Sequence, residues 1–186
     1  EGSNHQGIWS EGGGAGLALV ARAGDRAPGT PEGVNFSSVQ TPVMNNSGQT
    51  AFRAFVTGTN NVGIWSEGGG AGLTLVAFEG EQAPGTPTGV NFSNFTHPTT
   101  SSGGQTAFFG LLTGPGVSAT NDRGIWSEGG GAGLALVARE GNQAPDTSAG
   151  VNFFSLGTPV MNNNGEIAYY GVLTGTGING TNARGI

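Results

Sequence analysis

Three tryptophans, each followed two positions later by a glutamate, are the most regular set of side chains that could do chemistry in this chain. The pairs are Trp9 and Glu11, Trp65 and Glu67, and Trp126 and Glu128. An indole face can stack on a sugar ring, and a nearby carboxylate can accept hydrogen bonds from sugar hydroxyls. A repeated carbohydrate-binding site is therefore one interpretation. The other, which we favour, is that each tryptophan packs between sheets and each glutamate is a solvated strand end.

A glycine-rich segment follows each pair, as in residues 12–16, and could be read as a phosphate-binding loop. Such a loop lies between a strand and a helix, whose N-terminus meets the phosphate. Here an apolar strand-like segment, residues 17–22, follows instead, and the chain contains no lysine. We interpret the segment as a structural turn, and we expect no cofactor.

The remaining polar residues offer little for a metal site. The two histidines occupy non-equivalent positions, and the chain has no cysteine, so a zinc site is not expected. Asp25 becomes Glu81 and Asn142 in the later repeats, and Asp146 stands in place of Gly29. This variation does not resemble the regular oxygen ligands of a calcium loop, and it leaves calcium bridging between repeats as an alternative.

Catalytic side chains are not apparent either. Catalysis needs groups of complementary pKa that converge on one point. The chain holds three aspartates, nine glutamates and two histidines, but nothing in their spacing brings any pair together. No repeat carries an added polar cluster, so we expect that the protein is not an enzyme.

The amino-acid composition argues against two classes of partner, nucleic acids and membranes. The net charge is −6 and all six basic residues are arginine, which argues against nucleic-acid binding, because that affinity depends on neutralising phosphates. No segment approaches the roughly 20 apolar residues that a membrane helix needs. Polar residues are mainly Asn, Thr, Ser and Gln, a composition that suits an extracellular protein.

The tryptophan–glutamate pairs belong to a repeat that covers nearly the whole chain. The sequence Gly-Ile-Trp-Ser-Glu-Gly-Gly begins at Gly7, Gly63 and Gly124, so that successive copies start 56 and 61 residues apart. Its first two letters return at Gly185 and Ile186. Internal repetition of this length determines the fold class. The chain then divides into the tail of a preceding repeat, three repeats and the start of a further one: residues 1–6, 7–62, 63–123, 124–184 and 185–186.

Each repeat contains four candidate β-strands and no helical periodicity. In the first repeat they cover residues 7–11, 17–22, 36–44 and 49–57. Pro42 lies inside the third, which implies an edge strand or a bulge, because proline cannot donate to a neighbouring strand. The fourth is apolar on both faces, so we expect each sheet to be packed between neighbouring sheets.

Antiparallel sheets of four strands, stacked face to face, are typical of the blades of a β-propeller. We therefore predict an all-β chain of tandem four-stranded antiparallel, blade-like sheets with a β-propeller-like arrangement. Propellers close with roughly 4 to 8 blades, which three repeats alone do not supply. The alternative is an open stacked β-array in a fibre.

The turn and fourth strand carry a family resemblance. Residues 45–52 read Asn-Asn-Ser-Gly-Gln-Thr-Ala-Phe, and residues 162–169 read Asn-Asn-Asn-Gly-Glu-Ile-Ala-Tyr. This pattern resembles the NxxGxxAF tandem repeat of bacterial "choice-of-anchor" surface proteins, although residues 101–108 begin with Ser in place of the leading Asn. The resemblance implies export and attachment to the cell envelope through a sorting signal such as the PEP-CTERM type. It implies no activity and no catalytic residues.

These observations together predict an extracellular structural or assembly protein of a bacterial cell surface or matrix, which associates with itself into a ring or filament. Gly185 and Ile186 begin a strand that needs a partner, and the equivalent strand at the other end begins with Gly7, Ile8 and Trp9. We expect these residues to form an assembly strand that continues the repeat. The alternative is a lectin-like β-propeller that binds surface glycans.

Overall fold

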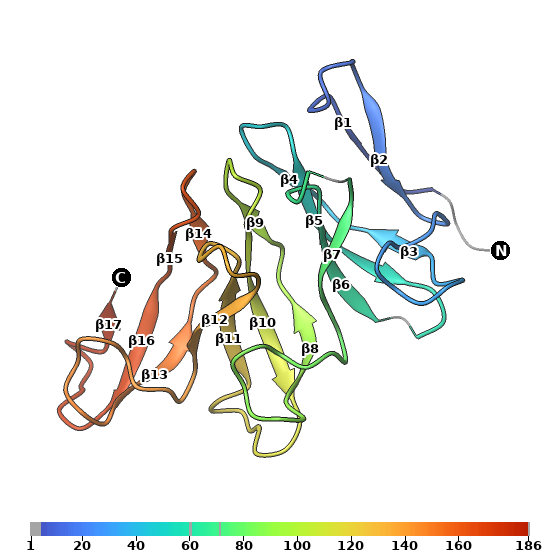
Figure 1. Ribbon diagram of the computed structural model, residues 1–186. Helices are drawn as coiled ribbons and strands as arrows, with labels where there is room; N and C mark the ends of the chain where they lie inside the picture. The colour runs from blue at the N-terminus through green and yellow to red at the C-terminus, as the bar shows by residue number, and fades with distance from the viewer. Residues whose placement is uncertain (1–4, 60, 71, 186) are drawn as a thin grey trace.

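The computed structural model describes residues 5–59, 61–70 and 72–185, and that part of the chain is all-β (Figure 1). Its 17 strands form five antiparallel sheets that stand side by side in a curved row (Figure 1). Within the described ranges no helix is long and apolar enough to cross a membrane. The predicted fold class is confirmed in its general form: an all-β chain of antiparallel sheets.

Two sheets in the middle of the row each contain five strands. The first joins β3 (Phe36–Val39), β4 (Val43–Met44), β5 (Thr50–Val56), β6 (Val62–Ser66) and β7 (Thr74–Phe78). The second joins β8 (Asn91–Phe95), β9 (Thr99–Thr100), β10 (Thr106–Thr113), β11 (Arg123–Ser127) and β12 (Ala135–Arg139). In each sheet the long central strand is β5 or β10, and two short strands share one of its edges. The strand that contains the tryptophan, β6 or β11, lies on the other edge and forms a hairpin with the strand that follows it; we call these the tryptophan strand and the tryptophan hairpin.

Smaller sheets stand at the two ends of the row (Figure 1). At the N-terminal end, β1 (Gly7–Ser10) and β2 (Ala18–Arg22) form a hairpin. At the other end, β13 (Val151–Leu156), β16 (Gly171–Gly175) and β17 (Arg184–Gly185) form one sheet, while β14 (Val160–Met161) pairs with β15 (Ile167–Ala168).

Each complete sheet combines strands from two consecutive repeats. The sheet β3–β7 takes its first three strands from residues 7–62 and its tryptophan hairpin from the next repeat, with only Val62 preceding the boundary. The sheet β8–β12 repeats this exchange between residues 63–123 and 124–184. The repeats counted from Gly-Ile-Trp therefore do not coincide with the sheets. One repeat alone cannot form a complete sheet, because the last two strands of that sheet come from the next repeat.

The third predicted strand of each repeat was expected to be continuous, and this was wrong. Residues 36–44 divide into β3 and β4, which pair with different parts of β5. Pro42 lies in the gap between them, where the absence of its N–H costs no ladder hydrogen bond. Each complete sheet consequently has five strands and not four. The fourth strand of the last repeat is also interrupted, at Tyr169 and Tyr170.

Neighbouring sheets share apolar cores, as the two-sided apolar pattern of the fourth strand predicted. Ile8 of the N-terminal hairpin packs against the cluster that contains Phe36, Phe52 and Trp65. In turn, Ile64 joins the cluster of the sheet β8–β12. Burial of this apolar surface between sheets holds the row together.

The turns that join the third and fourth strands meet across repeats. Asn45 Nδ2 donates to the Ser101 carbonyl at 2.6 Å, and Asn46 Nδ2 donates to Asn163 Oδ1 at 3.3 Å. The second contact joins the first and third repeats, which are not adjacent in sequence. The sheets therefore converge at this edge and diverge at the other, as the tips of β4, β9 and β14 show (Figure 1).

Candidate functional site

Trp65 and Trp126 occupy equivalent sites inside the two five-stranded sheets. Both side chains are 0% exposed. The Trp65 ring meets Phe36 edge-on at 4.9 Å between centroids and stacks on Phe52 at 6.5 Å. Its Nε1 donates to the Pro28 carbonyl at 2.9 Å, so the polar atom of the indole is satisfied. We call the two aromatic rings and the proline carbonyl that hold an indole a tryptophan socket.

The socket around Trp126 has nearly the same geometry. Phe92 lies edge-on at 4.8 Å, Phe108 is stacked at 6.5 Å, and Nε1 donates to the Pro84 carbonyl at 3.0 Å. These contacts place Trp65 and Trp126 inside the packed sheets, with both side chains buried. Neither indole ring has an exposed face on which a sugar could stack.

The last repeat forms the same socket with no indole among the described residues inside it. Phe153 and Tyr169 lie 6.0 Å apart with an interplanar angle of 60°, and the corresponding rings of the other two sockets are also 6.0 Å apart, at 59° and 63°. The rings line an open, largely apolar cavity of about 500 Å³ together with Pro145 and Gly171. Burial raises the pKa of Tyr169. We call this cavity the open socket.

Trp9 is placed quite differently from the other two tryptophans, since 54% of its surface is exposed. It pairs with Leu19 across the hairpin β1–β2, and Leu19 and Leu17 are exposed as well. The matching leucines of the next two hairpins pack against the buried apolar clusters of the two five-stranded sheets. One face of the N-terminal hairpin is thus an apolar surface without a cover in the described structure.

Glu67 and Glu128 are not the solvated strand ends that we expected. Glu67 Oε2 accepts hydrogen bonds from the Thr50 backbone N–H at 3.0 Å and from Thr50 Oγ1 at 2.7 Å. Glu128 Oε2 accepts from the Thr106 N–H at 3.0 Å. Each glutamate therefore holds the end of its tryptophan strand against the central strand of the same sheet. Glu11, by contrast, is exposed.

The residues of the expected assembly strand lie at opposite ends of the row. Gly7 and Ile8 belong to β1, where Ile8 is buried against the next sheet. Gly185 pairs with Gly171 in the terminal sheet, and Ile186 lies outside the described residues. Both histidines are exposed, and the described ranges contain no group of three or more side chains that could hold a metal ion.

Comparison with known proteins assigns a family. A family model described as "Family of unknown function (DUF7453)" matches residues 1–186. The chain belongs to this family. No curated protein matches the chain, and no solved structure does.

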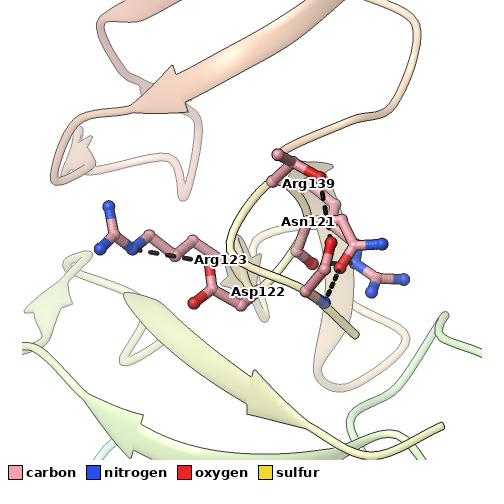
Figure 2. Close-up of polar contacts among 6 residues, drawn as sticks. Asn121, Asp122, Arg123 and Arg139 are labelled. Carbon is pink, nitrogen blue, oxygen red and sulfur yellow. Dashed lines mark hydrogen bonds and ion pairs between the residues drawn. The ribbon is translucent and has the colours of Figure 1, made fainter. Parts of the chain in front are cut away.

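This member of the family also contains a polar cluster that the sequence did not reveal, at the start of β11 and the end of β12 (Figure 2). Arg139 Nε donates to the Asn121 carbonyl at 2.8 Å, and Arg123 Nε lies 3.8 Å from Asp122 Oδ1. The neighbouring Glu140 is only 2% exposed. The cluster involves the loop between the fourth strand and the next tryptophan strand, whose length differs between repeats, so no repeating pattern could predict it.

Burial raises the pKa of Glu140, an effect that the nearby Arg123 offsets in part. The folded state therefore binds the proton more tightly than the unfolded state, and the free energy of unfolding falls as pH rises through the ordinary glutamate range and beyond it. We expect Glu140→Gln to be more stable than the wild type at pH 7, and the difference to vanish below pH ~4. Urea unfolding at a series of pH values measures this difference.

The exposed Glu32 supplies the control for this measurement, because Glu32→Gln removes the same charge without a buried environment. At pH 7 its free energy of unfolding should match that of the wild type within about 0.5 kcal/mol. A Glu140→Gln variant whose gain is the same at pH 3.5 and pH 7 would contradict the assignment, since protonation would then play no part.

Proposed function

We propose that the protein is a structural, non-enzymatic repeat protein that assembles at a bacterial cell surface or in an extracellular matrix. The observation that carries this proposal is the exchange of strands between consecutive repeats. Each tryptophan hairpin completes the sheet begun by the preceding repeat, with Phe52 opposite Trp65 and Phe108 opposite Trp126. A repeat built in this way is complete only when another repeat lies beside it.

The surfaces at the two ends of the described row are of the same kind as those that join consecutive repeats within it. One end presents an apolar hairpin with the exposed Trp9, and the other presents the open socket. A further repeat or a second molecule can supply the missing half at either end. Contacts of this head-to-tail kind generate rings if the rotation closes and filaments if it does not.

A β-propeller-like arrangement is the architecture that we propose for the assembly. Its support is the contact between Asn46 and Asn163, which brings the turns of the first and third repeats together at one edge of the row. Sheets that converge at one edge and diverge at the other resemble blades around an axis more than layers of a straight fibre. The open array stays the alternative.

The extracellular location rests on composition and on the family resemblance. The chain has no cysteine and no lysine, and its polar residues are mainly uncharged. The Asn-x-x-Gly turns at Asn45 and Asn162 resemble those of choice-of-anchor surface proteins, which are exported. Attachment to the envelope by a sorting signal is part of the same proposal.

The test of this function is the oligomeric state of the purified chain. We expect light scattering after size-exclusion chromatography to give a mass that rises with protein concentration, and electron microscopy to show rings or filaments. A chain that stays monomeric at its highest soluble concentration would contradict assembly. Catalytic turnover of a substrate by the purified protein would contradict the non-enzymatic role.

A further inference from the structure

We propose that Asn179 is a site of spontaneous covalent modification, at which the side-chain amide is converted to a mixture of aspartate and isoaspartate. Asn179 and Gly180 lie in the loop of residues 176–183, which joins β16 to β17, and both are exposed. The matching residues of the second repeat, Ser118 and Ala119, are exposed as well, although the hairpin β11–β12 follows them. Exposure is therefore a property of this loop in the repeat, and the modification does not depend on assembly.

The reaction joins the backbone nitrogen of Gly180 to Cγ, the side-chain carbonyl carbon of Asn179. A new C–N bond forms, and the amide nitrogen of Asn179 leaves as ammonia with the proton that Gly180 gives up. Water then opens the resulting succinimide ring at either of its two carbonyl carbons, which gives aspartate or isoaspartate. Water is the only co-reactant. Glycine at the second position favours ring closure, because it has no Cβ and the widest choice of backbone conformations.

The hydrogen bonds around Asn179 favour this attack. Asn179 Oδ1 accepts from the Thr181 backbone N–H at 2.9 Å and from Thr181 Oγ1 at 2.6 Å. These two donors orient the amide and stabilise the negative charge that develops on Oδ1 during the attack. The Gly180 N–H makes no hydrogen bond within the described residues, and a Cβ built on Gly180 would have no neighbour within 4 Å. The attacking nitrogen is thus free, and the carbon that it attacks is held in place.

A second Asn-Gly step, at Asn164 and Gly165, has an environment that opposes the same reaction. The Gly165 N–H donates to the Asn162 carbonyl at 3.1 Å, so the attacking nitrogen is engaged in a turn. Gly165 is also buried, and a Cβ built on it would lie 3.2 Å from the Gly129 Cα in the neighbouring hairpin turn. The sequence makes the two steps equivalent, whereas the structure selects Asn179.

The shape of the loop does not require asparagine at this position. Asn182 Oδ1 accepts from the Asn179 N–H at 2.7 Å, and in the second repeat Asn121 Oδ1 accepts from the Ser118 N–H at 2.8 Å. In both loops the same amide also donates to a glycine carbonyl. Asn179→Ser therefore reproduces the arrangement of the second repeat and removes only the reacting amide.

Peptide mapping by mass spectrometry, on protein incubated at neutral pH and physiological temperature, tests the inference. Cleavage after Glu166 places the two Asn-Gly steps in different peptides. In the folded chain we expect Asn179 to convert about tenfold faster than Asn164, the factor that corresponds to one hydrogen bond on the Gly165 nitrogen. In the chain unfolded in urea the two should convert at similar rates, because the Asn-Gly sequence alone then governs the reaction.

Two variants separate the contributions at Asn179. Thr181→Val removes the hydroxyl donor and keeps the backbone donor, so we expect conversion at Asn179 to slow about fivefold while Asn164 is unaffected. Asn179→Ser should unfold at the same urea concentration as the wild type. An isoaspartyl methyltransferase should label the peptide after Glu166 in aged wild type and not in Asn179→Ser. Conversion in the folded chain that is equal at the two steps, or slower at Asn179, would overturn the inference.

Discussion

Replacing Trp126 by alanine is expected to lower the free energy of unfolding by about 3 to 5 kcal/mol. The side chain is fully buried between Phe92 and Phe108, and its Nε1 donates to the Pro84 carbonyl. Truncation would remove these contacts, open a cavity that two aromatic rings cannot fill, and leave the carbonyl without its partner. Because Trp126 packs between strands from two repeats, the substitution would weaken the contact between those repeats.

Trp9→Ala is the matched control, since it makes the same chemical change at an exposed position. At concentrations where the chain is monomeric, we expect it to change stability by no more than about 0.5 kcal/mol. Denaturant unfolding compares the two variants, and hydrogen exchange locates the damage, which should centre on strands β8 to β12. Equal losses for the two substitutions would show that socket packing does not stabilise the fold.

The strands were predictable from sequence because their pattern is local. Alternating apolar residues, glycine turns and the Asn-x-x-Gly segments mark where β5, β10 and their neighbours begin and end. The apolar residues on both faces of the fourth strand also predicted stacking between sheets. The position of Pro42 indicated an edge strand or a bulge, but sequence alone did not show that the chain leaves the sheet and rejoins it on the same neighbour.

The pairing between repeats could not be read from the pattern, because a repeat has the same order of strands wherever it is taken to begin. Which strands form one sheet depends on long-range packing, namely that of Phe52 beside Trp65 of the next repeat. For the same reason Trp9, Trp65 and Trp126 were assigned one role from their shared motif, whereas their environments differ. The role of Glu67 was missed because its partner, Thr50, lies on another strand.

Alanine at Gly104 is expected to destabilise the protein by about 3 kcal/mol or more. Gly104 has φ +84°, in the left-handed region that alanine rarely adopts. A Cβ at this position would lie 2.3 Å from the Gly68 carbonyl oxygen, an atom of the backbone that no side-chain rotation can move away. Gly68 and Gly104 belong to turns of adjacent sheets, so the substitution would separate the sheets at this edge.

Gly33→Ala separates the two contributions to this effect. Gly33 has nearly the same φ, +82°, but a Cβ there would have no neighbouring atom within 4 Å. Its cost should be the backbone strain alone, about 1 kcal/mol. Denaturant unfolding of the two variants therefore yields the cost of close approach as their difference. If both variants lose the same stability, the contact between the Gly68 and Gly104 turns is not what requires glycine, and convergence of the sheets at this edge must depend on the Asn45 and Asn46 contacts instead.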